Sequence, residues 1–120
     1  MKYFFLFILS ISLFSCDTEL STDDSVREEP THLLSKEVFT DLYYDIQLTE
    51  AAVRIEIGKG ADSKEISAYL YEKLLEKYGI TPTDLKENVR YYSSDPQQMS
   101  DIQTEVVNRL TKKEAELTNQ

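Results

Sequence analysis

The feature that most constrains the fold is the scarcity of helix-breaking residues and the places where they stand. In 120 residues there are three glycines and three prolines, nearly all at the ends of segments whose apolar residues recur with helical spacing. No segment shows the period-two alternation of apolar and polar residues that is typical of a strand. The sequence therefore predicts an all-α fold, a small bundle of about four helices.

Two long segments form the first half of this expected bundle. The first helix begins after Ser35 as N-cap and runs to about Ile57, where the glycines of Gly58-Lys59-Gly60 end it. The second opens at Asp62, with Glu65 completing a capping box, and stops at Gly79. The apolar stripe of the first comprises Val38, Leu42, Ile46, Val53 and Ile57, widened by Phe39 and Tyr43; that of the second comprises Ile66, Leu70, Leu74 and Tyr78.

Proline marks the start of each of the last two helices. Thr81-Pro82-Thr83-Asp84 is a capping box with proline at the first helical position, and this short helix ends near Ser93-Ser94. Asp95-Pro96 repeats the device. The expected core residues of these helices are Leu85, Val89 and Tyr92, followed by Met99, Ile102, Val106, Leu110 and Leu117.

The N-terminal segment has the pattern of a bacterial lipoprotein signal. Lys2 precedes an apolar run from Tyr3 to Leu13, and Leu13-Phe14-Ser15-Cys16 forms a lipobox that ends at the only cysteine. We expect residues 1–15 to be removed between Ser15 and Cys16, and Cys16 to carry lipid, including palmitate-like acyl chains. A transmembrane anchor is the alternative, but the apolar run falls well short of the roughly 20 residues needed to span a bilayer. An ordinary secretory signal prefers small residues where Leu13 stands.

Residues 16–30 are acidic and hydroxyl-rich and lack apolar periodicity, which predicts a disordered tether between the lipidated Cys16 and a domain at 31–120. The expected location is the cell envelope at the outer membrane, with the periplasmic and surface faces both open. The inner membrane stays as an alternative, because Asp directly after the cysteine retains lipoproteins there in some bacteria, whereas an acidic cluster marks export to the cell surface in others. The chain has a formal charge of −9, and loss of Lys2 takes the mature form to −10. Such a charge argues against nucleic acid as a partner.

Catalytic and metal sites are not expected from the residue types present. His32 is the only histidine, and with Cys16 used for lipid no second histidine or thiol remains to complete a metal site. No serine lies in a Gly-x-Ser-x-Gly turn. We therefore predict no catalytic residue, no metal and no cofactor, and a protein that is not an enzyme.

Three acidic residues of the first helix are the remaining candidates for chemistry. Asp41 and Asp45 are four residues apart and share a helical face, and Glu50 follows. Asp45 adjoins Ile46 on the apolar stripe, where a carboxylate needs a donor such as a tyrosine hydroxyl, a helix N-terminus or Arg90. We interpret Asp45 and Glu50 as structural or binding residues. A catalytic group built on all three acids stays as an alternative.

Tyrosine is the abundant aromatic residue, with eight copies and no tryptophan. Neighbouring side chains on a helix are about 100° apart, so Tyr91 and Tyr92 cannot both face the core. We expect one of them to be buried and the other to lie at the rim as a contact residue. For the tyrosines as a set, packing is favoured over binding because a domain this small is short of apolar volume.

Four motifs together resemble a known family. They are Asp45-Ile46-Gln47-Leu48-Thr49-Glu50-Ala51-Ala52, Tyr78-Gly79-Ile80-Thr81, Tyr91-Tyr92 and Pro96, in that order after a lipobox and Pro30. This combination resembles the small lipoproteins of Bacteroidetes that carry a single domain of unknown function. The resemblance implies a helical domain held at the envelope and implies no enzymatic activity.

Two hypotheses for function follow from these features. The first is a non-enzymatic envelope lipoprotein whose helical domain binds another protein as an accessory or assembly factor. The second is a small-ligand or glycan-binding module that uses exposed tyrosines together with Asp45 or Glu50. The membrane, through the lipid on Cys16, and an envelope protein are the expected partners.

Overall fold

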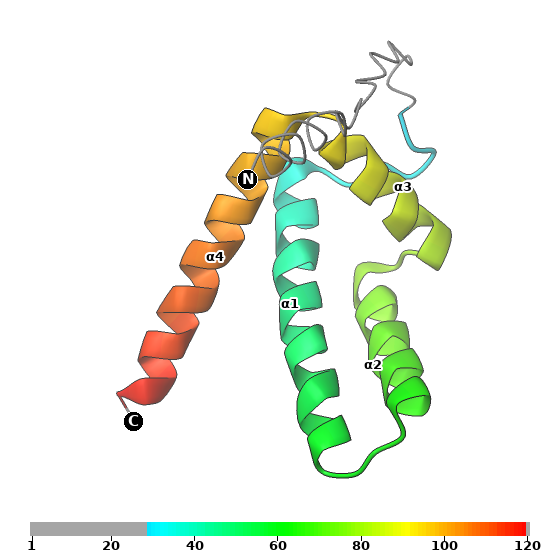
Figure 1. Cartoon of the computed structure of the whole chain (residues 1–120). Helices are drawn as coiled ribbons and strands as arrows, with labels where there is room; N and C mark the ends of the chain where they lie inside the picture. The colour runs from blue at the N-terminus through cyan, green and yellow to red at the C-terminus, as the bar shows by residue number, and fades with distance from the viewer. Residues whose placement is uncertain (1–28, 120) are drawn as a thin grey trace, which may run out of the picture.

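The structure, a computed structural model, describes residues 29–119. Within this range the chain forms four helices and no strand: α1 (Lys36–Gly58), α2 (Ser63–Tyr78), α3 (Pro82–Ser93) and α4 (Pro96–Thr118) (Figure 1). The all-α prediction is confirmed for the described residues. The predicted signal peptide, the lipid site at Cys16 and all but the end of the tether lie outside them.

The helices begin with the N-cap residues that the sequence predicts, but within the described residues the capping box expected of Asp62 and Glu65 has only its Asp62 half. The Ser35 side chain accepts from the Val38 amide, and the Asp62 carboxylate accepts from the amides of Lys64 and Glu65. Thr81 and Asp84 form both bonds of a capping box. Gly79 has φ 62°, a left-handed conformation that costs little without a Cβ, so α2 can end there and the chain can turn into α3.

The four helices share α1 as their central element. Helix α2 returns antiparallel along one side of α1, while α4 runs in the same direction as α1 on the other side and separates from it toward the C-terminus (Figure 1). Helix α3 crosses the end of the bundle and contacts α4. Side chains of the second half of α4 are consequently exposed from Thr111 onward.

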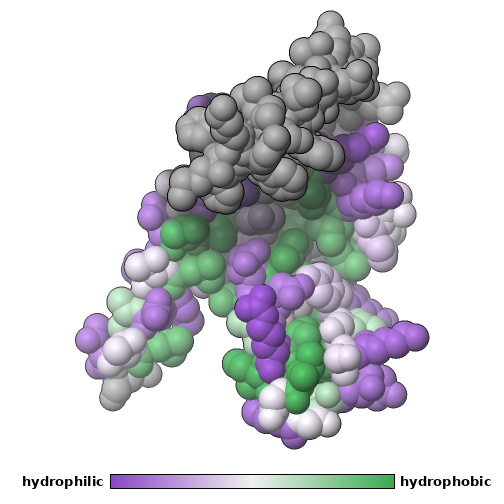
Figure 2. All heavy atoms as spheres, in the orientation of Figure 1, coloured by the Kyte–Doolittle hydropathy of each residue, from purple (hydrophilic) through white to green (hydrophobic). Residues whose placement is uncertain are grey.

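The core lies where the N-terminal half of α1 meets α3 and α4. Phe39, Leu42 and Ile102 are at most 1% exposed. The Tyr92 ring stacks on Phe39 with 4.4 Å between ring centroids, and Leu74 brings α2 into the same cluster. Figure 2 shows apolar residues gathered where α1, α3 and α4 meet.

The burial of three residues differs from the sequence prediction. Val38 is 39% exposed and Ile57 is 41% exposed, so the centre of the buried face of α1 passes through Phe39 and Leu42 instead. Leu117 is 61% exposed because α4 has separated from α1 at that point. Figure 2 also shows apolar residues at the C-terminal end of α1. They are exposed because α4 has separated from α1 at this end of the bundle and no longer covers them.

Candidate functional site

Asp45 and Glu50 join α1 to α2 through tyrosine hydroxyls. The Tyr78 hydroxyl donates to Asp45 Oδ2 at 2.6 Å, and Lys77 Nζ lies 2.5 Å from the same oxygen. The Tyr71 hydroxyl donates to Glu50 Oε1. Of the donors that the sequence suggested for Asp45, a tyrosine hydroxyl is therefore the one that the structure supplies. Both carboxylates link α1 to its antiparallel neighbour.

These bonds alter the acidity of the two tyrosines. Burial, followed by the hydrogen bond to Glu50, raises the pKa of Tyr71 to about 12. Burial and the bond to Asp45 likewise raise the pKa of Tyr78 above its ordinary value. Each hydroxyl thus stays protonated and donating well into the alkaline range, so at neutral pH its oxygen is not available as a base.

The three candidate acids of α1, Asp41, Asp45 and Glu50, are not brought together at one site. Asp41 pairs with Arg109 of α4, whose Nη1 lies 2.5 Å from Asp41 Oδ1, whereas Asp45 and Glu50 pair with α2. Within residues 29–119, no three histidine, cysteine, aspartate or glutamate side chains are grouped as a metal site would require. Each of these acids instead links α1 to a neighbouring helix.

Tyr92 is the buried member of the tyrosine pair. It is 4% exposed and its hydroxyl donates to the Leu34 carbonyl at 2.6 Å. Tyr91 is half-buried and its ring meets Tyr92 edge-on, with 5.3 Å between centroids. Tyr92 therefore links the segment before α1 to α3, and Tyr91 packs against its ring.

Asn88 is a buried polar residue that sequence reasoning did not single out. Its side chain is fully buried, its Oδ1 accepts from the Leu34 amide, and its Nδ2 donates to the carbonyls of His32 and Asp84, each at 2.8 Å. The imidazole of His32 is exposed, 3.8 Å from the Asp84 carboxylate. Asn88 and Tyr92 together hydrogen-bond the backbone of residues 32–34 to α3.

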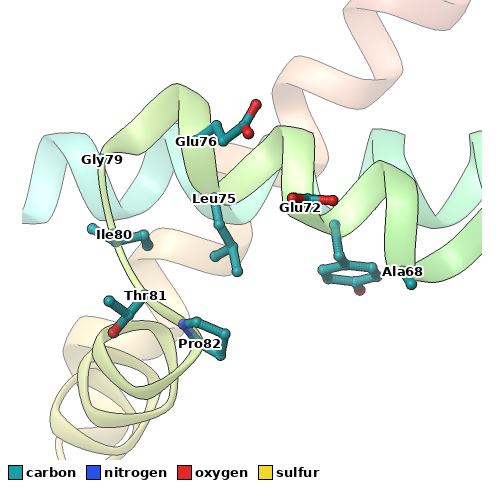
Figure 3. Close-up of a pocket in the computed structure, with 9 residues that line it drawn as sticks. Ala68, Glu72, Leu75, Glu76, Gly79, Ile80, Thr81 and Pro82 are labelled. Carbon is teal, nitrogen blue, oxygen red and sulfur yellow. The ribbon is translucent and has the colours of Figure 1, made fainter.

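A groove lies at the junction of α2 and α3, with a volume of about 540 Å³. Figure 3 shows Leu75 and Pro82 directed into the space between the two helices, with Ile80 on the connecting turn. Glu72 and Glu76 line the groove from α2, and the Glu76 carboxylate is directed away from Pro82. Tyr71, Ala68, Gly79 and Thr81 complete the lining. The Gly79 turn and the capped start of α3 were both expected from sequence, but the groove they form was not.

A second and smaller hollow, of about 430 Å³, lies between α1 and α4. Charged side chains dominate its lining: Lys36, Asp41, Asp101, Glu105 and Arg109. Glu37 also lines it. The other charges are paired with one another, Lys36 with Asp101, and Arg109 with Asp41 and Glu105. It therefore offers less apolar surface to a ligand than the α2–α3 groove.

Comparison of the sequence with known protein families identifies one match. A family model described as a domain of unknown function (DUF4296) matches residues 30–116. The chain belongs to this family. The DUF4296 match spans α1, α2, α3 and nearly all of α4, so the groove and the links between helices are both parts of the family domain.

The expected single domain of unknown function is thus confirmed. None of the curated proteins or solved structures compared with the chain matches it. None of the helices in the described part of the chain is both long enough and apolar enough to cross a membrane.

Proposed function

We propose that this DUF4296 protein is a lipid-anchored protein of the cell envelope, at the outer membrane, and that its helical domain binds another protein. The anchor rests on the lipobox at Cys16 and the binding role rests on the α2–α3 groove. In this proposal the domain is an accessory or assembly module and performs no reaction. The acids that were candidates for chemistry support it, because each of them links α1 to another helix.

The observation that carries the proposal is an apolar groove that the domain does not fill itself. Leu75 and Pro82 face it, and Ile80, which is 7% exposed, completes its apolar lining. The domain is small and has few apolar residues to spare for its surface. Apolar concave surfaces edged by polar groups are typical of sites where proteins receive a helix or a peptide.

Crosslinking in the natural host tests this function. Ala68 is exposed and lines the groove, so Ala68→Trp should fill the groove with little effect on the core. Ala115→Trp adds the same side chain to an exposed position of α4 and serves as the matched control. We expect one repeatable partner to crosslink to the anchored wild-type protein and to the control, and to be lost with Ala68→Trp. Recovery of the monomer alone from all three would contradict the proposal.

A small apolar ligand is the second candidate function, because the groove volume of about 540 Å³ lies within the range of about 300–1,000 Å³ found for small-molecule sites. A ligand that binds only the folded protein raises its melting temperature by mass action. A thermal-shift screen with wild type and Ala68→Trp therefore separates the candidates: a small ligand stabilises wild type alone, whereas a protein-binding groove shows no shift with small molecules.

A further inference from the structure

The chemistry of the α2–α3 groove narrows the kind of protein that fits it. Hydrogen-bond donors on the connecting turn are already used within the domain. The Thr81 amide and hydroxyl donate to Asp84 Oδ2 at 2.8 and 2.7 Å, and the amides of Gly79 and Ile80 donate to carbonyls at the end of α2. Pro82 has no amide hydrogen.

The one hydroxyl on the α2 wall is also occupied. Tyr71 donates to Glu50, so it presents its ring to the groove and no free hydroxyl hydrogen. The polar groups left along the edge are carboxylates. Glu76 shares its charge with Lys73 in an exposed ion pair at 2.8 Å, and such pairs contribute little and rearrange readily. Glu72 has no ion-pair partner among the described residues.

The groove therefore combines an apolar floor with an edge that accepts hydrogen bonds and carries negative charge. A complementary surface must be apolar on one side and must bring donors and positive charge to the rim. The excess of acidic residues in the whole chain, with a formal charge of −9, draws the same kind of partner.

We propose that the groove binds a basic amphipathic helix of another envelope protein, an inference that rests on the proposed protein-binding function. The apolar face of that helix, with residues at helical spacing, packs on Leu75, Pro82 and the Tyr71 ring. Its Lys or Arg side chains donate to Glu72 and Glu76. A second copy of this chain is the rival occupant, because α4 ends in an exposed segment that carries Lys112, Lys113 and Leu117.

Peptide binding to the mature full chain, purified with its anchor in neutral detergent, tests the proposal. The probe is a labelled synthetic helix of Leu, Ala and Lys, compared with the same helix in which Glu replaces Lys. Fluorescence anisotropy measures binding to wild type, to Glu72→Gln/Glu76→Gln and to Glu114→Gln/Glu116→Gln. The last variant removes the same charge from exposed positions of α4 and is the matched control.

We expect the basic helix to bind wild type and the α4 control alike, and Glu72→Gln/Glu76→Gln to weaken it at least about tenfold, because charge-assisted contacts at a partly desolvated rim are lost. Binding should weaken as salt is raised. All three proteins should share one melting temperature, since the substituted side chains are exposed.

Equal binding of the basic and acidic helices, or equal loss in the two double variants, would overturn the inference. The proposed function would survive that result if Ala68→Trp still abolished the crosslink in the natural host. Sedimentation of the protein alone tests whether a second copy of the chain occupies the groove. Self-association that Ala68→Trp abolishes would assign the groove to that second copy and would overturn the inference.

Discussion

Asn88 is the residue whose hydrogen bonds most directly fix the segment before α1. Asn88→Ala would leave the Leu34 amide and the His32 carbonyl without their buried partner. Unpaired buried groups cost about 1–3 kcal/mol each, so we expect the free energy of unfolding to fall by about 2–4 kcal/mol. Urea denaturation measures this change. Lys86→Ala, at an exposed position of the same helix, should alter it by less than about 0.5 kcal/mol. Equal effects of the two substitutions would show that the Asn88 bonds do not stabilise the domain.

Tyr71 should make the stability of the domain depend on pH in alkaline solution. Its pKa is raised from 10.0 to about 12 in the folded protein. Because the folded state holds this proton more tightly than the unfolded state, the stabilisation is complete below pH 10.0 and is lost as the pH rises through about 12. Tyr78, whose pKa is also raised, adds to the loss in the same direction.

The melting temperature measured as a function of pH checks this prediction. Tyr71→Phe cannot ionise and should show a shallower alkaline decline than wild type, although the lost hydrogen bond to Glu50 lowers its stability at neutral pH. Tyr69→Phe is the matched control, since Tyr69 is 55% exposed, and it should follow the wild-type curve. An alkaline decline in Tyr71→Phe as steep as that of wild type would contradict the assignment.

Among the helices, α1 contributes most to packing because its contacts with α2 and α4 are the most extensive and it carries the fully buried Phe39 and Leu42. Leu42 and Leu74 are 0% and 6% exposed, and Leu42→Ala or Leu74→Ala should each lower the free energy of unfolding by about 2–5 kcal/mol. Val38→Ala is the control from the exposed side of α1 and should cost less than about 1 kcal/mol. Guanidinium denaturation measures all three. Costs below about 0.5 kcal/mol at both leucines would contradict the described core.

Helix boundaries could be predicted from sequence because capping is local chemistry. Asp62 and Thr81 accept hydrogen bonds from residues two or three positions away, and the Gly79 turn needs only the absence of a Cβ. Helix faces were less predictable, because exposure depends on which neighbours cover them. Val38 and Leu117 have the spacing of core residues, yet both are exposed.

The contacts that form the candidate site could not be predicted from local sequence patterns, because they join residues far apart in the chain. Asp45 was predicted to need a donor from its place beside the apolar stripe, but the donor is Tyr78, 33 positions away. Asn88 pairs with Leu34 across 54 positions. The groove arises only when the end of α2, the Gly79 turn and the start of α3 come together, so its acidic edge could not be read as a site from Glu72 and Glu76 alone.

For the whole molecule, the proposed function requires that the domain be held at a membrane through Cys16. Each buried methylene of an acyl chain contributes about 0.8 kcal/mol, so two or three chains suffice to anchor a protein whose acidic surface has no attraction for anionic lipid.

In the natural host we expect wild type to incorporate labelled palmitate and to have the mass of a chain that begins at Cys16. Cys16→Ala should take up no label and keep residues 1–15, because the modified thiol is what the lipobox presents for cleavage. Ser15→Gly keeps a small residue before the cysteine and should be labelled and cleaved like wild type. A bare Cys16 thiol in protein from the natural host would contradict the lipid anchor. The α2–α3 groove would still be tested separately by crosslinking and by peptide binding.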